Sequence, residues 1–343
     1  MSELRFAVAG FKHFHILEFV KGMLLLPNTR LVGIYDDDPA LRATYQQEYD
    51  VPAYDSIEKL VDEQQPEVVG LAMENSRKAD TVAELTRLGC HVLSDKPLVT
   101  SLDQLDLVER CADQHQRQVG LMLLERYNAP TRTFRDKLAN GEFGQLVSFA
   151  GLAPHKLKPA GRPDWMFDPS LYGGVLNDLA IHNVDLVRWL WKQEPEWVTA
   201  AEGCLRFRDY KGFSDHAEIF MVFDDSSTAM MRADWLTPEA HPTHGDGRQV
   251  FECTNATVEI RAAPDIHTLG EGEVLVDAWE QPRTTIGNTE PERTLYDEFV
   301  AQCRGEEFTP ELTAKDAFRS TRLTLYAREA AHTASKIDLR GKL

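Results

Sequence analysis

The sequence predicts an α/β protein in which a doubly wound parallel sheet is followed by an α+β domain with a large, mostly antiparallel open sheet. The chain has 343 residues, enough for roughly two domains of about 150 residues each. Apolar strand runs alternate with amphipathic helices through the first third of the chain, and this pattern is typical of βαβ units. After about residue 125, strand-like runs follow one another with short turns between them. We place the two domains at residues 1–124 and 125–343.

The amino-acid composition restricts which classes of protein and which partners fit this chain. Hydrophobic residues make up 43% of the chain and charged residues 27%, which is typical of a globular protein. The formal net charge of −18 would repel nucleic-acid backbones and anionic lipid, so we expect neither as a partner. The five cysteines are odd in number and form no CxxC pair, which favours reduced thiols. No apolar run approaches ~18 residues, so we expect a cytoplasmic protein.

In the first domain, buried strands and amphipathic helices follow in turn. A helix after the first strand places Ile16, Phe19 and Met23 on one face. Asp38 is an N-cap candidate before a helix that begins at Pro39, and Ser101 and Gln104 have capping-box spacing. The expected strands are residues 5–9, 31–35, 68–73, 91–94 and 119–124.

In the second domain, β-branched and alternating runs predict a mainly antiparallel sheet. The expected strands are residues 146–152, 198–207, 217–223, 228–235, 249–254, 258–261 and 274–278. The expected helices are residues 131–140, 175–191, 292–303 and 313–335. We expect the helix near 175–191 to cover one face of the sheet and the last two helices to pack back on the first domain. The long loop from Pro154 to Gly174 suggests a functional segment.

The loop after the first strand resembles a degraded phosphate-binding motif. A dinucleotide-binding domain carries G-x-G-x-x-G at this point, but here the segment from Gly10 to His15 keeps only Gly10. Lys12 and His15 occupy the second and third glycine positions, with Phe11 and His13 in the spaces between. In one interpretation Lys12 supplies a cation to the diphosphate and the helix N-terminus still donates its N–H groups. In the other, the cofactor is weakly held or absent.

The second strand ends at a run of three aspartates. Asp36 lies where an acidic residue can accept hydrogen bonds from the adenosine ribose hydroxyls. Asp37 and Asp38 follow, and three adjacent carboxylates would repel a 2′-phosphate. NAD is therefore favoured over NADP. The same run can also be an ordinary acidic turn with a helix cap.

Two further groups of residues have the chemistry of proton transfer. Lys96, in Ser94-Asp95-Lys96-Pro97, follows a strand at the edge where open α/β sheets bind ligands, and a lysine there can have a lowered pKa. Asp178 and His182 are four residues apart, so a helix places them on one face, where the carboxylate can orient the imidazole. Each group alone also fits a salt-bridged lysine or a surface pair.

Taken together, these motifs resemble the glucose–fructose oxidoreductase / inositol dehydrogenase family (Gfo/Idh/MocA) over nearly the whole chain. Asp95-Lys96-Pro97 stands where the family has Glu-Lys-Pro, and Gly173 to His182 matches its Gly-Gly-x-x-x-Asp-x-x-x-His. Arg126-Tyr127-Asn128 matches its Arg-Tyr-Asn, and Asn75 matches the asparagine of its Pro-Asn-x-x-His turn. In that turn Glu74 replaces the proline and Lys78 the histidine.

The resemblance implies an N-terminal Rossmann domain, NAD(P)-linked chemistry on a sugar, polyol or related hydroxy compound, and a homodimer or homotetramer formed through the open sheet. It implies Lys96, Asp178 and His182 as the catalytic group. The residues expected to bind the cofactor are Gly10, Phe11, Lys12, His13, Asp36, Asn75, Asp95 and Lys96. Those expected to bind substrate are Arg126, Tyr127, His155, Arg162, Trp165, Asp178 and His182. No metal is expected, because no spacing supports a site built from His155, His182 and Asp185.

Two alternatives to a dehydrogenase remain open at this stage. A redox-neutral enzyme would keep NAD bound and use transient oxidation of one hydroxyl to drive elimination, epimerisation or glycoside cleavage. A sensor would keep the fold without catalysis, and the degraded glycine loop is the feature that favours it.

Overall fold

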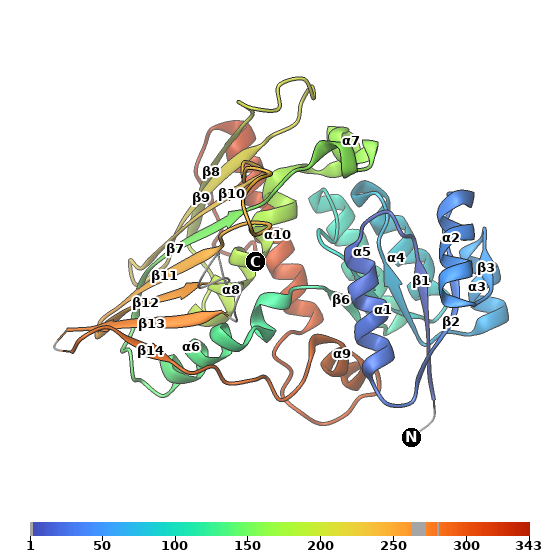
Figure 1. The fold of residues 1–343 in the computed structure, drawn as a ribbon, viewed down its shortest axis with the longest axis horizontal. Helices are drawn as coiled ribbons and strands as arrows, with labels where there is room; N and C mark the ends of the chain where they lie inside the picture. Colours follow the sequence, from blue (N-terminus) through green and yellow to red (C-terminus); the bar gives the residue numbers. More distant parts are fainter. Residues whose placement is uncertain (1–2, 262–271, 280) are drawn as a thin grey trace. The chain divides into compact units, whose positions relative to one another are not determined.

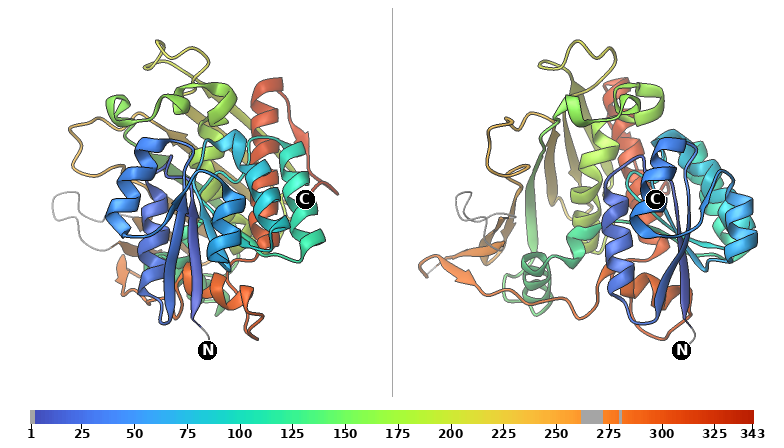
Figure 2. Two further views of the ribbon diagram at one scale, coloured as in Figure 1. Left: turned by 90° about the vertical axis from the view of Figure 1, so that its right-hand side faces the viewer. Right: turned by 45° about the vertical axis from the view of Figure 1, so that its right-hand side comes forward.

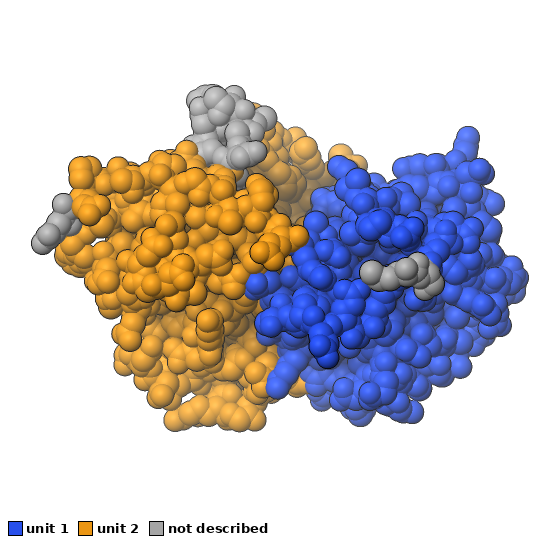
Figure 3. Space-filling view, turned by 90° about the horizontal axis from the view of Figure 1, so that it is seen from below, with its two compact units in different colours: residues 1–122, 170–173, 293–318 blue, residues 123–169, 174–292, 319–343 orange. Residues whose placement is uncertain are grey.

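The computed structural model describes residues 3–261, 272–279 and 281–343, and the chain divides into two compact units (Figures 1 and 3). Unit 1 comprises residues 1–122, 170–173 and 293–318, and unit 2 comprises residues 123–169, 174–292 and 319–343. The chain thus passes from one unit to the other after Met122, close to the expected boundary. Helix α9 (Leu295–Cys303) belongs to unit 1, and α10 (Ala314–Thr333) contributes to both units.

Unit 1 contains the expected parallel sheet. Its strands run in the order β3-β2-β1-β4-β5-β6, and every neighbouring pair is parallel. The order reverses between β1 and β4, and the crevice beyond the carboxyl ends of these strands is where doubly wound sheets bind ligands. The strands are β1 (Leu4–Ala9), β2 (Thr29–Tyr35), β3 (Ala53–Tyr54), β4 (Val68–Leu71), β5 (His91–Ser94) and β6 (Val119–Leu121).

The helices of this sheet begin where the sequence places caps. The Asp38 side chain accepts from the Ala40 backbone N–H at 2.8 Å, and the Ser101 hydroxyl accepts from that of Gln104 at 3.3 Å. The capping box is only half formed, because the Gln104 side chain accepts from the Thr100 N–H instead of that of Ser101. The helices are α1 (His15–Leu25), α2 (Pro39–Tyr49), α3 (Ile57–Gln64), η1 (Asn75–Arg77), α4 (Lys78–Arg87) and α5 (Leu102–His115).

Unit 2 is built on a nine-stranded sheet in the order β14-β13-β12-β11-β7-β10-β9-β8-β15. The β10–β7 pair is parallel and the other neighbours are antiparallel. Helices α6 (Ala129–Ala139), α8 (Ile181–Trp191) and α10 lie on one face of this sheet (Figures 1 and 2). The strands are β7 (Leu146–Pro154), β8 (Trp197–Gly203), β9 (His216–Val222), β10 (Thr228–Asp234), β11 (Arg248–Cys253), β12 (Ala256–Arg261), β13 (Glu273–Ala278), β14 (Thr284–Ile286) and β15 (Ile337–Asp338).

Several segments differ from the sequence-based expectation: β3, β14 and β15 were not predicted, and β8 ends at Gly203 instead of residue 207. The predicted helix at 175–191 opens with a π-helical segment, η5 (Leu176–Ala180), before α8 begins. Single π-helical turns within α-helices are frequent at functional sites. The long loop from Pro154 contains three short helical segments: η3 (Pro159–Gly161), η4 (Asp164–Phe167) and α7 (Pro169–Tyr172). Among the described residues, no helix is both long and apolar enough to span a membrane.

Candidate active site

The turn between β1 and α1 depends on Gly10. Its φ of +86° lies in the left-handed region, and a Cβ at this position would be 2.5 Å from the Ala72 carbonyl oxygen. The turn therefore passes so close to the end of β4 that only glycine fits. The next residue, Phe11, donates its backbone N–H to the Asp36 carboxylate at 2.7 Å, which ties the turn to the end of β2.

Lys12 faces the acidic end of β2. Its Nζ lies 2.9 Å from Asp37, 3.6 Å from Asp36 and 4.0 Å from Glu74. Burial alone would lower the pKa of Lys12, but these carboxylates raise it. Lys12 is therefore held as a cation at the end of β2, where a ribose would lie in a dinucleotide fold.

Asp36 and Asp37 have different surroundings. Asp36 is buried, and its carboxylate accepts the backbone N–H groups of Phe11 and Asp38, so both of its oxygens are already engaged. Asp37 has a side chain that is 34% exposed, and it pairs with Lys12 and with Arg77 at 2.9 Å. Burial raises the pKa of Asp36. For Asp37, burial alone would raise the pKa, but the hydrogen bonds from Lys12 and Arg77 lower it to about 2.

Asn75 and Lys78, from the turn after β4, have internal partners. The buried Asn75 amide donates to the Tyr172 carbonyl at 2.8 Å, so it fixes the 170–173 segment to unit 1. Lys78 is fully buried, and its ammonium donates to the Asp95 and Pro97 carbonyls at 2.8 and 2.9 Å. Lys78 therefore holds the backbone of the Asp95-Lys96-Pro97 segment on both sides of Lys96.

Three side chains meet at the start of α1. The Asp95 carboxylate lies 2.8 Å from His13 Nδ1 and 3.0 Å from His15 Nδ1. Burial lowers the pKa of His13. Burial alone would raise the pKa of Asp95, but His13, Lys78 and His15 hold it well below its usual range. His15 is a site residue that the sequence analysis treated only as a lost glycine.

Lys96 follows Asp95 at the carboxyl end of β5, and it too is buried. The peptide bond between Lys96 and Pro97 is cis. Lys96 thus lies at the edge of the parallel sheet where ligands bind, as its position in the sequence predicts.

The other two predicted catalytic residues belong to unit 2. Asp178 is buried in η5, and His182 is half-buried in the first turn of α8. The buried Asn177 amide, next to Asp178, has a nitrogen with no hydrogen-bond partner among the described residues. A buried donor of this kind is rare and needs an explanation, such as a ligand or a water.

Arg126 forms a structural ion pair. It lies in η2 (Leu124–Tyr127), is buried, and donates to both oxygens of Asp185 at 2.7 and 2.6 Å. Asp185 also accepts from the Ser320 hydroxyl of α10 at 2.8 Å. A bidentate pair of this kind fixes side-chain geometry, so we assign Arg126 to joining η2 to α8 rather than to contacting substrate. Its neighbour Tyr127 is half-buried.

The remaining predicted substrate residues lie in and around the 154–174 loop. The His155 ring packs edge-on against Trp235 and His244, with ring centroids 5.7 and 5.2 Å apart. The Arg162 guanidinium lies 5.0 Å from the Trp235 ring centroid and donates to the Leu157 carbonyl. The structure thus brings His155 and Arg162 to the same tryptophan, a grouping that the sequence analysis did not foresee.

Trp165 is buried in η4, and its indole nitrogen has no hydrogen-bond partner among the described residues. Tryptophan N–H groups usually find a partner when buried. The indole is therefore available to donate to a ligand oxygen.

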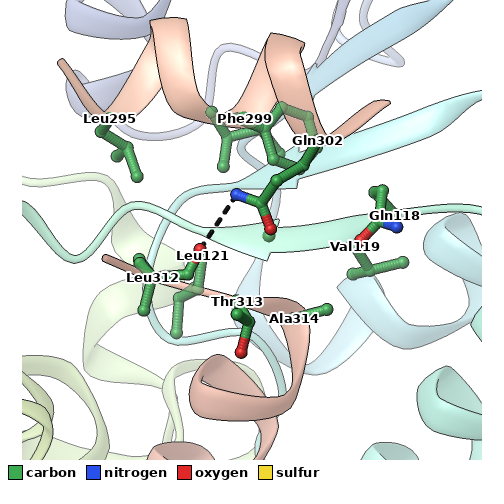
Figure 4. Close-up of a pocket in the computed structure, with 11 residues that line it drawn as sticks. Gln118, Val119, Leu121, Leu295, Phe299, Gln302, Leu312, Thr313 and Ala314 are labelled. Atoms are coloured by element: carbon green, nitrogen blue, oxygen red, sulfur yellow. Dashed lines mark hydrogen bonds between the residues drawn. The ribbon is translucent and has the colours of Figure 1, made fainter. Parts of the chain in front are cut away.

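Unit 1 contains a small cavity that none of the predicted site residues lines. Gln302 of α9 donates to the Leu312 carbonyl at 3.0 Å across it, and the β6 residues Val119 and Leu121 line another side (Figure 4). Its volume of about 10 Å³ is enough for one water and far too small for a sugar.

Comparison with known proteins decides the family. The model of the oxidoreductase family with an NAD-binding Rossmann fold (GFO/IDH/MocA) matches residues 4–122, and the model of the GFO/IDH/MocA C-terminal domain matches residues 131–259. The chain belongs to the GFO/IDH/MocA family. It is an oxidoreductase of this family, and the predicted fold class and function are confirmed.

Relatives of this GFO/IDH/MocA chain include sugar dehydrogenases. A D-xylose 1-dehydrogenase (NADP(+)) from Haloferax volcanii is 26% identical over 90% of this chain and 91% of its own length. A glucose-6-phosphate 3-dehydrogenase from Bacillus subtilis is 23% identical over 49% of each chain.

Solved structures show the same fold. A protein from Erwinia carotovora atroseptica has a TM-score of 0.88 at 25% identity, covering 96% of this chain and 98% of its own. An inositol dehydrogenase homologue from Azotobacter vinelandii, solved with NAD+, has a TM-score of 0.82 at 16% identity, covering 98% and 97%.

Proposed function

We propose that this GFO/IDH/MocA chain is an NAD-dependent dehydrogenase that moves a hydride between a carbinol carbon of a sugar or polyol and the nicotinamide. The observation that carries the proposal is that all three candidate proton-transfer residues are present, although the glycine loop keeps only Gly10. Lys96 is buried at the ligand edge of the sheet in unit 1, and Asp178 and His182 are one helical turn apart in unit 2.

Each of the three residues has a role in this proposal. His182 accepts the proton of the substrate hydroxyl, Asp178 orients the imidazole and balances its charge, and Lys96 stabilises the developing alkoxide or relays the proton. NAD, held by the turn at Gly10 and by Asp37, would supply the hydride acceptor. General acid–base assistance of this kind contributes roughly 10²–10⁴ to the rate.

The loop residues fit a dinucleotide cofactor. Gly10 allows the turn between β1 and α1 to pass against the end of β4, where no Cβ fits, and the exposed carboxylate of Asp37 lies at the end of β2, where a ribose would lie. In the proposed arrangement Asp37 accepts hydrogen bonds from the ribose hydroxyls in place of Asp36, which is buried. Its negative charge disfavours a 2′-phosphate, which supports NAD over NADP even though one relative uses NADP.

The substrate class is supported by the unpartnered donors of unit 2. The Trp165 indole and the Asn177 amide each present a buried N–H without a partner in the described part of the chain. Sugars and polyols offer hydroxyl oxygens that accept such bonds, and two buried donors would favour them over apolar alcohols.

The outer face of the nine-stranded sheet supports a homo-oligomer. Four residues form a row across neighbouring strands of that face. Phe220 pairs with Met230, Met230 with Ala150, and Ala150 with Val250. Phe220 and Met230 are exposed, and a contiguous apolar row on an open sheet face is a typical contact surface between copies of a chain. We place this assembly in the cytoplasm, consistent with free cysteines.

The test is turnover by the purified chain on a panel of sugars and polyols, with NAD and with NADP. We expect NADH to form with at least one substrate. Lys96→Ala and His182→Ala should each lower kcat by roughly 10²–10⁴ while NAD binding, measured by calorimetry, is retained.

Three results would contradict the proposal. Turnover without net NADH would indicate a redox-neutral reaction, and bound NAD without turnover on any compound would indicate a sensor. Unchanged kcat in both variants would remove these residues from the mechanism.

A further inference from the structure

We propose that His13, His15 and Asp95 form a binding site for one divalent transition-metal cation, such as zinc, at the start of α1. One ring nitrogen of each histidine and one Asp95 carboxylate oxygen lie within 4.8 Å of one another. All three residues belong to unit 1, so the site is complete within a single compact unit.

Two of the candidate ligand atoms are buried and have only each other as an ion-pair partner among the described residues. His13 is 8% exposed and Asp95 is 1% exposed, and neither His13 Nδ1 nor Asp95 Oδ2 has a hydrogen-bond partner among the described residues. The two atoms lie 2.8 Å apart and pair with each other. Buried polar atoms without a hydrogen bond are rare, and a cation held between the three side chains would account for both atoms.

The ligand set suits a zinc-like cation. Two imidazoles and a carboxylate are borderline nitrogen and oxygen ligands, which bind zinc and its neighbours in preference to calcium or magnesium. Metal binding uses the imidazoles in their neutral form and the carboxyl group as a carboxylate, so the affinity should fall as the pH is lowered.

The distances require only a small adjustment. Ligand atoms around a tetrahedral zinc, at ~2.1 Å from the metal, are about 3.4 Å apart. The Asp95 oxygens are now 2.8 and 3.0 Å from the two Nδ1 atoms, so the imidazoles must move outward by about half an ångström. Side-chain rotation supplies this movement, because His15 is partly exposed.

Nearby cations limit the affinity. Lys78 donates to the backbone carbonyls of Asp95 and Pro97, and Lys96 follows Asp95 directly in the chain. Their positive charges oppose a dication beside a single carboxylate. We therefore expect moderate affinity and one open coordination position, as in zinc sites with three protein ligands.

The test measures metal binding to the full chain without cofactor or substrate, so its outcome is independent of the proposed dehydrogenase activity. Chelator-treated protein is titrated with Zn²⁺ by calorimetry, and metal content after gel filtration is measured by mass spectrometry. We expect one zinc per chain. His15→Gln and Asp95→Asn should each weaken binding by more than about 100-fold, because loss of even an outer partner typically costs 10–100-fold.

His332→Gln is the matched control. His332 is an exposed histidine that pairs with one carboxylate, that of Glu202 at 2.8 Å, and this pair contains no second histidine. Its zinc affinity should equal that of the unmodified chain. Circular dichroism of each metal-free variant checks that the fold is retained.

A second measurement requires no variant. Zinc added to the unmodified chain should shift the imidazole nitrogen resonances of His13 and His15 in NMR spectra, and Co²⁺ should give visible absorption bands of a low-coordinate nitrogen–oxygen site. Absence of stoichiometric zinc, unshifted resonances of both histidines, or full binding in both variants would each overturn the proposal.

Discussion

At the scale of single residues, the two aspartates that end β2 have opposite roles. Asp36 is buried and accepts two backbone N–H groups, so it shapes the turn that carries Gly10. Asp37 remains partly exposed, with Lys12 and Arg77 as partners. Asp37 is therefore the exposed carboxylate of the pair.

Asp37→Asn should raise the affinity for NADP relative to NAD by about tenfold or more, since two charges ~4–7 Å apart in a partly solvated site interact by about 1–4 kcal/mol. The variant also releases Lys12 and Arg77 to pair with a 2′-phosphate. Calorimetric titration with both dinucleotides measures the ratio. Asp55→Asn, which removes an exposed carboxylate paired with Lys59, is the control. An unchanged ratio would show that Asp37 does not face the ribose.

Trp165 gives a second prediction at this scale. Trp165→Phe keeps an aromatic ring and removes the unpartnered indole N–H. If the indole donates to a substrate hydroxyl, KM should rise by roughly 2–10-fold, the worth of one hydrogen bond, with little change in kcat. Trp279→Phe removes an indole N–H that donates to the Thr254 carbonyl at an exposed position, and it should leave KM unchanged. An equal KM in the Trp165 variant would exclude this contact.

At the scale of elements, a hydrogen bond to a histidine side chain links β5 to the start of β6, in addition to the backbone pairing of the two strands. The Gln118 backbone N–H donates to His91 Nδ1 at 2.9 Å, so His91 must be neutral to accept it. Burial, with a smaller effect of Arg117, lowers the pKa of His91 to about 4. In the unfolded chain the pKa returns to ~6.5.

Between pH 6.5 and pH 4 the unfolded state therefore binds a proton that the folded state does not, so acid destabilises the protein through His91. We expect His91→Gln to reduce the loss of unfolding free energy between pH 7 and pH 5 by about 1–2 kcal/mol, allowing for partial solvent screening. Urea denaturation at the two pH values measures this difference. An equal loss in both proteins would show that His91 does not titrate in this range.

At the scale of the whole molecule, the open face of the nine-stranded sheet decides the proposed assembly. A stable interface buries at least about 1,000 Å² and excludes unpaired charge from its centre. Met230, 54% exposed in the middle of the apolar row, is the natural centre of such a contact.

Met230→Asp should convert the oligomer to monomers, as measured by light scattering after gel filtration, because a buried unpaired carboxylate costs several kcal/mol. Leu25→Asp changes a leucine that is 76% exposed on α1 of unit 1 and should leave the assembly intact. A native chain that is monomeric, or a Met230 variant that still assembles, would place the contact elsewhere.

The alternation of buried strands and helices predicted unit 1 closely because parallel strands are buried on both faces and therefore give continuous apolar runs. The π-helical turn η5 was not predicted, because a π turn and an α turn share nearly the same hydrophobic pattern. Arg126 was assigned to substrate by its motif, but its partner Asp185 is 59 residues away, beyond the reach of local pattern. His15 was treated as a missing glycine for the same reason, since Asp95 is 80 residues distant.

The sequence by itself predicted the alternating architecture and the family, and it supplied Lys96, Asp178 and His182 as the candidates for proton transfer. These follow from local periodicity and from residues at short, fixed spacing. Only the tertiary structure decided which charged side chains have partners inside the protein. Asp36 accepts backbone N–H groups, Arg126 pairs with Asp185, and Lys12 pairs with the carboxylates at the end of β2. Burial and pairing between distant segments set these roles, because a charged side chain removed from water must find its partner wherever the fold brings one.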